Sequence, residues 1–177
     1  MYTNADTLHN KLDELHALVR DKNPAIFGIT EVKPKNNRYQ ILESELSIQG
    51  YYTISINLNN NIGRGIILYV RNDMIVEEID LQKGNEPFNE CLSAELTVNK
   101  KEKLLIAIVY RSPNSSETNN QSLLELLQLI ANTKYPTKVV AGDFNYRDIN
   151  WENMTILGSE HRKDKENFIE GVTCSSM

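Results

Sequence analysis

The spacing of apolar residues at the start of the chain changes from a helical to a strand pattern. Apolar side chains recur at 3.6-residue spacing over residues 6–21, which predicts a helix with Asp6 and Thr7 as candidate N-caps. The stretch "PAIFGIT" that follows is short and apolar, which is typical of a buried strand. This strand leads directly into Glu31, and a polar, Lys-rich loop is expected after it.

The middle of the chain contains runs that predict paired strands. "YYTISINL" predicts one strand, and "RGIILYVRN" and "MIVEEID" predict a hairpin that turns at Asn72 and Asp73. "CLSAELTV" and "KLLIAIVYR" predict a second pair joined by "NKKE". The glycines of "GRG" open a strand rather than a helix, so they favour a tight turn or close backbone approach over a dinucleotide site.

The last third of the chain predicts two helices around one strand. A helix is expected over 121–132, where Ser122 and Glu125 have the spacing of a capping box. "KVVAGDFN" predicts the last clear strand, and a charged helix is expected over 161–170. Strands in hairpin pairs with few helices indicate the α+β class, an α/β sandwich of two packed, mainly antiparallel sheets flanked by helices.

Composition adds limits to this outline. The 177 residues are 40% hydrophobic and 24% charged, which suits one globular domain with a core. No apolar run reaches the roughly 18 residues of a membrane helix, so no membrane partner is expected. Cys91 and Cys174 lie far apart without a CxxC motif, which argues against a zinc cluster or a disulfide framework. An intracellular setting is therefore expected.

The net charge of −5 does not indicate a polyanion partner. Three weak basic clusters are each interpreted as solvated surface: Lys33, Lys35 and Arg38; Lys100, Lys101 and Lys103; and Arg162, Lys163 and Lys165.

Polar side chains follow three apolar strands of the predicted sheets. One strand ends at Glu31, one at Tyr110 and Arg111, and one at Asp143 and Asn145. Each has a simpler interpretation: a loop acid, a tyrosine at the rim of a sheet, and a turn stabilised by Asp and Asn. If the strands share a sheet and a direction, however, these ends converge.

Convergence would bring two carboxylates together. Glu31 and Asp143 would repel each other at short range, and a divalent cation would remove that repulsion. Carboxylate and amide oxygens favour Mg²⁺ or Mn²⁺ over zinc. Such an ion suits phosphoester hydrolysis, because it neutralises the phosphate and stabilises the leaving oxygen.

The motifs "GITE", "VYRSP" and "VVAGDFN", in this order, resemble the endonuclease/exonuclease/phosphatase family. More narrowly, "YTNADTLHNKLDEL", "ITEVKPKN", "GRGIILYVRND" and "GDFNYRDINWE" resemble the apurinic-type endonuclease domain of non-LTR retrotransposons. The resemblance covers about residues 2–170 and implies a four-layer α/β sandwich.

The resemblance assigns metal binding to two residues. Glu31 matches the principal metal-binding acid, and Asn4 matches a first-strand asparagine that helps to bind metal and phosphate. Taken without the resemblance, Asn4 is interpreted as a helix cap beside Asp6.

The resemblance also assigns the groups around the scissile phosphate. Tyr110 matches the tyrosine that contacts this phosphate. Asp143 matches the acid that orients or deprotonates the attacking water, and Asn145 matches the amide that steadies the phosphate. Arg111 is a candidate contact to the DNA backbone.

One family motif has no counterpart in the sequence. The family ends with a Ser-Asp-His motif, whereas "GSEH" at 158–161 follows Asn145 too closely to replace it. We therefore expect a partial family domain over 1–170, shortened at both ends, a non-homologous tail over 171–177, and impaired activity.

The expected function is a Mg²⁺- or Mn²⁺-dependent DNA endonuclease of a retroelement, whose parent element also encodes a reverse transcriptase and which would act in the nucleus. Two alternatives stay open. One is a catalytically dead remnant that keeps the fold and at most binds metal or nucleic acid. The other is a phosphatase of the same family.

Overall fold

The computed structural model describes residues 1–36, 40–82, 87–98, 102–158 and 162–174. Two compact units are present, and each is described by itself. The first unit comprises Met1–Ile79, Glu90–Tyr110 and Tyr135–Asp143, and the second comprises Asp80–Asn89, Arg111–Lys134 and Phe144–Met177.

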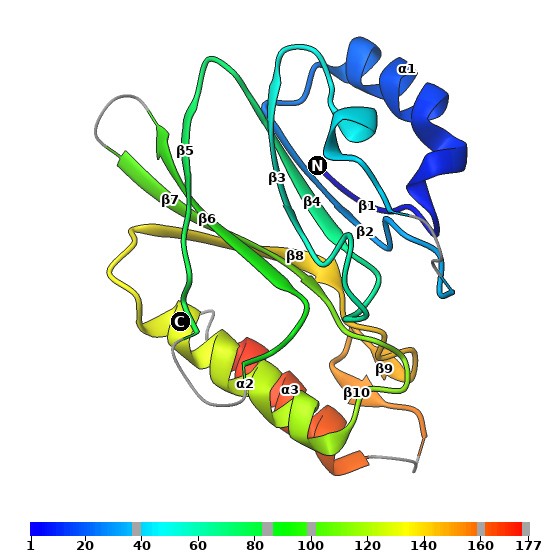
Figure 1. Cartoon of the computed structure of the whole chain (residues 1–177). Helices are drawn as coiled ribbons and strands as arrows, with labels where there is room; N and C mark the ends of the chain where they lie inside the picture. The colour runs from blue at the N-terminus through cyan, green and yellow to red at the C-terminus, as the bar shows by residue number, and fades with distance from the viewer. Residues whose placement is uncertain (37–39, 83–86, 99–101, 159–161, 175–177) are drawn as a thin grey trace. The chain divides into compact units, whose positions relative to one another are not determined.

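The first unit contains two four-stranded sheets, which Figure 1 shows. One sheet has the order β1-β2-β4-β3, in which β1 is parallel to β2 and the other pairs are antiparallel. Its strands are β1 (Tyr2–Asn4), β2 (Ile26–Thr30), β4 (Ile66–Arg71) and β3 (Tyr51–Ile56). The other sheet has the order β5-β6-β7-β8, in which only β7 and β8 are parallel. Its strands are β5 (Ile75–Glu78), β6 (Cys91–Val98), β7 (Glu102–Tyr110) and β8 (Thr137–Asp143).

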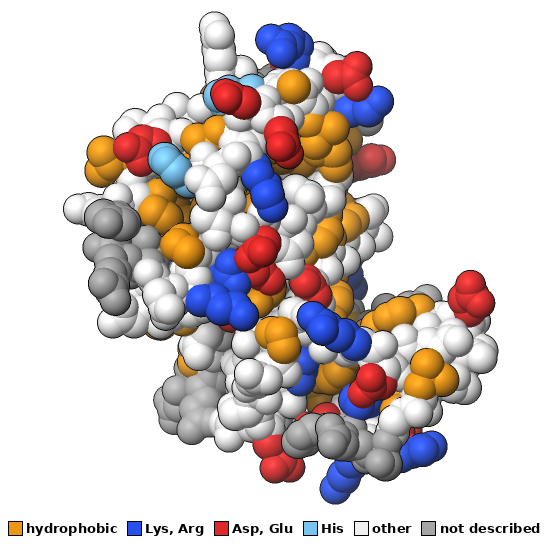
Figure 2. Space-filling model, turned by 90° about the vertical axis from the view of Figure 1, so that its right-hand side faces the viewer, with side chains coloured by type: hydrophobic (Ala, Val, Ile, Leu, Met, Phe, Trp, Pro, Cys, Tyr) orange, Lys and Arg blue, Asp and Glu red, His pale blue; other side chains and the backbone are white. Residues whose placement is uncertain are grey.

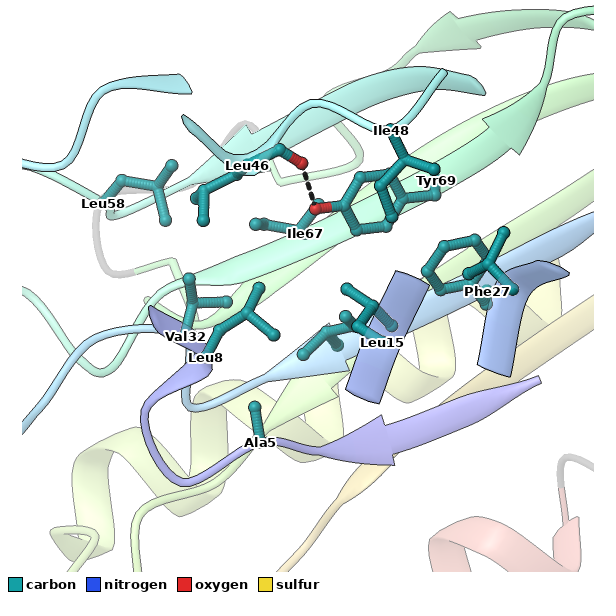
Figure 3. Packing of buried hydrophobic residues seen from close by; sticks show 12 residues of the cluster. Ala5, Leu8, Leu15, Phe27, Val32, Leu46, Ile48, Leu58, Ile67 and Tyr69 are labelled. Carbon is teal, nitrogen blue, oxygen red and sulfur yellow. Dashed lines mark hydrogen bonds between the residues drawn. The ribbon is translucent and has the colours of Figure 1, made fainter. Parts of the chain in front are cut away.

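A helix and two short 3₁₀ turns cover one face of the first sheet. These are η1 (Leu8–Lys11), α1 (Leu12–Lys22) and η2 (Glu43–Leu46). Leu15 and Val19 of α1 are buried against Phe27 and Tyr69 of the sheet. Figure 3 shows this core, in which the Tyr69 hydroxyl donates a hydrogen bond to the Leu46 carbonyl at 2.6 Å. The buried phenol therefore keeps a polar partner, as burial of a polar group requires.

The other face of the first sheet packs on the second sheet. Residues of β4, β6 and β7 form one apolar cluster, which includes Leu68, Ala94 and Ile108. Gly28 of β2 lets the sheets approach closely, because a Cβ at this position would lie 2.5 Å from Ile108 Cδ1. The strands β2 and β7 thus lie near enough for their ends to contribute to one site.

The described residues of the second unit form two helices and a short hairpin. These are α2 (Glu117–Asn132), α3 (Arg162–Cys174), β9 (Ile149–Asn150) and β10 (Thr155–Ile156). The buried ring of Phe168 in α3 contacts the rings of Phe144, Tyr146 and Trp151. This aromatic cluster joins α3 to the segment that follows β8 in the sequence.

The predicted α+β class and the sandwich of two sheets are confirmed. The hairpin predicted at Asn72 and Asp73 is wrong, because β4 pairs with β2 and β3 whereas β5 pairs with β6. The chain therefore crosses from one sheet to the other at this turn.

The helix starts also differ from the prediction. Asp6 and Thr7 have φ values of 41° and 82° and precede a 3₁₀ turn that lacks a side-chain cap, so the predicted N-caps are wrong. The helix predicted from residue 121 begins at Glu117, because the Ser116 hydroxyl accepts a hydrogen bond from the Asn119 N–H. Ser122 instead donates within the helix to the Thr118 carbonyl.

Two lysines from the clusters predicted to be solvated are buried, Lys33 at 3% and Lys165 at 7% exposure. Lys33 donates to backbone carbonyls, and Lys165 pairs with Asp148 at 2.6 Å. Arg38, Lys100 and Lys101 of the same clusters lie outside the described residues. Within the described part of the chain, no helix combines the length and apolar character that crossing a membrane requires.

Candidate active site

Four strand ends of the first unit meet at one place. Asn4 ends β1 beside Thr30 of the parallel strand β2, and Glu31 comes directly after Thr30. Tyr110 ends β7 opposite Asp143, the last residue of the parallel strand β8. Glu31 therefore reaches the site from a different sheet than Tyr110 and Asp143, and the sequence-based condition that all three strands share one sheet is wrong.

The side chain of Asn4 joins the two predicted carboxylates. Its Nδ2 donates to Glu31 Oε1 and to Asp143 Oδ2, both at 2.9 Å. Its Oδ1 accepts a hydrogen bond from the Asp6 N–H at 3.0 Å, which fixes the orientation of the amide. One amide group thus holds together two acids that are 112 positions apart in the sequence, Glu31 and Asp143.

The backbone around the site contains residues in the left-handed region. Glu31 has a φ of 55°, and Asp6 and Thr7 also have positive φ. Such conformations cost free energy for residues with a Cβ and gather at functional sites. At Glu31 the conformation turns the chain immediately after β2 and places the carboxylate beside Asn4.

A buried arginine completes the surroundings of Glu31. Arg64 Nη1 pairs with Glu31 Oε2 at 2.6 Å, and Nη2 pairs with Asp6 Oδ1 at 3.0 Å. The Arg64 side chain is 9% exposed, whereas that of Asp6 is 78% exposed. This pairing holds the pKa of the Asp6 carboxyl below its ordinary value, first through the hydrogen bond from Arg64 and then through its charge.

The "GRG" turn positions this arginine. Gly63 has a φ of 54°, and a Cβ there would lie 1.8 Å from Glu90 Oε1, so the turn requires glycine. Glu90 Oε1 accepts a hydrogen bond from the Arg64 N–H at 2.8 Å. Burial is the main cause that raises the pKa of the Glu90 carboxyl. The expectation that these glycines permit a tight turn and close approach is confirmed.

Two tyrosines lie next to the carboxylates. Burial raises the pKa of Tyr110, and the charge of Glu31 and a side-chain hydrogen bond to Glu31 raise it further. Burial also raises the pKa of Tyr2 to about 12, although a hydrogen bond with Thr30 Oγ1 at 2.8 Å opposes the shift. Both phenols therefore stay protonated at neutral pH and can donate hydrogen bonds to an anion.

The donor set fits a hard divalent cation. The Asn4 NH₂ group lies between Glu31 Oε1 and Asp143 Oδ2. A hard cation that binds oxygen ligands could take the same position between these two carboxylates. To bind the metal directly, Asn4 would have to use its Oδ1 atom. In this structure Oδ1 accepts a hydrogen bond from the Asp6 N–H, so metal binding by Asn4 stays a prediction. Among the described residues, no group of three or more His, Cys, Asp and Glu side chains could hold a metal ion. A site here would therefore rest on two carboxylates and an amide.

The other two predicted residues belong to the second unit. Asn145 has a φ of 52°, and its Nδ2 donates to the Arg111 carbonyl at 2.7 Å. Arg111 Nη1 donates to the carbonyls of Phe144 and Asn145 at 3.3 and 3.4 Å. Its guanidinium lies 4.0 Å from the centre of the Tyr146 ring, a cation–π contact. The buried Arg111 thus holds Asn145 in its left-handed conformation.

This geometry gives Arg111 a structural task. Its Nε donates to Asn120 Oδ1 at 2.8 Å, and Asn120 Nδ2 donates to Asp164 Oδ2 at 3.2 Å. Contact between Arg111 and DNA stays a prediction, for a residue that is 6% exposed.

The sequence matches the endonuclease/exonuclease/phosphatase family over residues 2–163. The chain belongs to this family. No curated protein matches it in a sequence search. Family members from distant sources share the fold, as the following three solved structures show.

An AP endonuclease from Leishmania major superposes with a TM-score of 0.67 at 13% identity, covering 98% of this chain and 65% of the other. The endonuclease domain of TRAS1, a telomere-specific non-LTR retrotransposon, gives 0.66 at 14% identity, covering 98% and 68%. The 3'-5' exonuclease NExo from Neisseria meningitidis gives 0.67 at 17% identity, covering 98% and 70%. The chain thus spans about two thirds of the length of these family members, and at such identities the likeness concerns the fold.

Sequence reasoning missed three residues of this site. Arg64 lies in a stretch interpreted only as a turn, Glu90 lies just before a predicted strand in a stretch with no predicted element, and Tyr2 lies two positions before Asn4 in β1. The available signal for Tyr2 was strand periodicity, because residues i and i+2 point to the same face. Arg64 gave no such signal, since its partners Lys33 and Asp6 are 31 and 58 positions away.

Proposed function

We propose that the chain is a Mg²⁺- or Mn²⁺-dependent phosphodiester hydrolase that cuts DNA, the endonuclease of a non-LTR retroelement. The observation that carries the proposal is the bridge from Asn4 to both Glu31 and Asp143. It places two carboxylates within reach of one small group, beside the buried tyrosine Tyr110. The presence of the TRAS1 endonuclease domain and an AP endonuclease among the similar structures supports the choice of substrate class.

The residues divide the work by their chemistry. Asp143 accepts the proton of the attacking water and orients it toward phosphorus. The neutral phenol of Tyr110, which hydrogen-bonds Glu31 in this structure, would turn its O–H to a phosphate oxygen when substrate binds. Asn145 keeps the phosphate role that the family resemblance assigns to it.

Glu31 is the first choice for holding the cation, with Asn4 beside it. When bound, the ion neutralises the phosphate and stabilises the leaving oxygen. In the protein, the guanidinium of Arg64 and the amide of Asn4 keep the Glu31 carboxylate in place.

Plasmid nicking tests the proposal. We expect nicking by the wild-type chain with Mg²⁺ or Mn²⁺ and none with EDTA. Asp143→Asn and Glu31→Gln should each lower the rate at least about 100-fold, a typical cost of losing such a group. Asp13→Asn and Glu45→Gln remove an exposed charge of the same type on α1 and η2 and should leave the rate unchanged.

Two outcomes would count against this proposal. Equal nicking in all samples would indicate a contaminant, and no nicking by the wild-type chain at any metal concentration would favour a remnant without catalysis. The 177 residues lack the Ser-Asp-His motif, so we expect slow catalysis by this chain. Single-turnover conditions with excess protein are therefore the suitable assay.

A phosphatase is the second candidate. The similar structures include NExo described as a 3' phosphatase with a product DNA hairpin, and a mannosyl-6-phosphatase from Bacteroides thetaiotaomicron, with TM-scores of 0.64 and 0.56. Both reactions attack phosphorus and would use the same carboxylates. Comparing release of phosphate from a 3'-phosphorylated hairpin and from a sugar phosphate with nicking of plasmid separates the two candidates.

A further inference from the structure

The two carboxylate oxygens of Glu31 have different partners. Oε1 accepts from Asn4 Nδ2 at 2.9 Å, on the side of Asp143. Oε2 pairs with Arg64 Nη1 at 2.6 Å. The Glu31 and Arg64 side chains are 13% and 9% exposed, so water competes little for this pair. One oxygen therefore faces the site while the other is committed to the arginine.

Arg64 is itself held on all sides. Nε donates to the Lys33 carbonyl at 2.7 Å, Nη2 to Asp6 Oδ1 at 3.0 Å, and the backbone N–H to Glu90 Oε1 at 2.8 Å. The guanidinium thus has a fixed place that does not depend on Glu31. A rigid cation at this distance decides which oxygen of Glu31 is available.

We propose that Arg64 is a positioning residue for Glu31, which withholds Oε2 so that the carboxylate binds its cation through Oε1 alone. The inference rests on the proposed function, because it needs a metal ion at Glu31. The "GRG" turn places the Arg64 side chain beside Glu31.

A consequence follows from the charges. The positive charge of Arg64 lies next to the place of a second cation and weakens the binding of that cation. Loss of the Arg64 side chain would leave the carboxylates of Glu31 and Asp6 without their cationic partner and would free Oε2 of Glu31. The cation should then bind more tightly but in another geometry, so the affinity for metal should rise while turnover falls. If Arg64 were only structural, its loss would instead lower both the affinity for metal and the turnover.

Arg64→Met and Arg64→Gln provide the test, with Mn²⁺ as the probe. By electron paramagnetic resonance titration, we expect Mn²⁺ to bind the variants about tenfold more tightly than wild type. Mn²⁺ should also raise their melting temperature by more than it raises that of wild type, because binding adds more free energy to the folded state. In the nicking assay, kcat should fall at least about tenfold with little change in KM for DNA.

Two further variants separate charge from geometry. Arg64→Lys keeps the positive charge without the fork of the guanidinium, so Mn²⁺ affinity should stay near that of wild type while kcat falls. Arg71→Met removes an arginine that pairs with Asp73 at the far end of β4, and it should change neither quantity.

The outcomes distinguish the inference from the proposed function. If wild type binds no Mn²⁺, both are overturned. If wild type binds Mn²⁺ but Arg64→Met and Arg64→Gln bind it equally or more weakly, the inference alone is overturned. Tighter binding with an unchanged kcat would also contradict it.

Discussion

Asn4 decides the geometry of the site at the scale of single residues. As a sequence feature it could be interpreted as a helix cap, and its Oδ1 does accept from the Asp6 N–H. Its Nδ2 donates to Glu31 and Asp143, and these hydrogen bonds connect the end of β1 to the residue after β2 and to the end of β8. A family resemblance could predict this residue, whereas Arg64 could not be predicted because its partners are distant in sequence.

The raised pKa of Tyr2 makes the free energy of unfolding depend on pH. Its pKa of about 12 lies above the ordinary value of 10, so folding favours the neutral phenol. This contribution to stability is complete below pH 10 and is lost as the pH rises from 10 to 12. We expect the free energy of unfolding, from urea titrations, to fall less steeply in this window for Tyr2→Phe, by up to about 1.4 kcal/mol per pH unit.

The control for this prediction is Tyr52→Phe, which changes a tyrosine that is 51% exposed on β3. Its slope should match that of wild type. If Tyr2→Phe also matches wild type, burial in the folded protein does not raise the pKa of the Tyr2 phenol as the structure indicates.

At the scale of elements, periodicity predicted the strands well but not their partners. β4 and β5 are consecutive and have hairpin-like spacing, yet they belong to different sheets. Local sequence determines that a turn occurs between them, whereas the pairing of each strand depends on long-range contacts. The short strands β9 and β10, of two residues each, were missed because such a length gives no period.

Arg111 forms a hydrogen-bond network that joins several elements of the second unit. Arg111 connects the segment after β7 to α2 through Asn120, and Asn120 connects it to Asp164 of α3. Arg111→Lys would keep the charge but lose the fork that reaches both Asn120 and the Phe144 carbonyl. We expect it to lower the free energy of unfolding by about 1–3 kcal/mol, since buried acceptors lose their donor.

Chemical denaturation of Arg111→Lys, beside Arg147→Lys as the matched control, checks this. Arg147 is exposed in the loop after β8, whose Phe144 carbonyl Arg111 contacts, so its exchange should change stability by less than about 0.5 kcal/mol. Equal stability of the two variants would show that the hydrogen bonds of Arg111 do not hold the loop.

At the scale of the whole molecule, charge and fold give different indications. The net charge is −5, and Figure 2 shows acidic and basic side chains interspersed on the face it presents. Non-specific attraction to DNA should therefore be weak and should fall further with salt, because it depends on phosphate contacts by basic side chains. The proposal of a nucleic-acid substrate therefore does not rest on charge, and the similar endonuclease structures are its support.

Direct titration with Mn²⁺ tests the central claim, that Glu31 and Asp143 meet at a cation site. Electron paramagnetic resonance of the wild-type chain should show a single tight site that Mg²⁺ displaces. Glu31→Gln and Asp143→Asn should each weaken it at least about tenfold, because the site has few ligands to spare. Glu45→Gln and Asp13→Asn should bind as wild type does. Binding that is absent in wild type, or equal in all five proteins, would contradict the account.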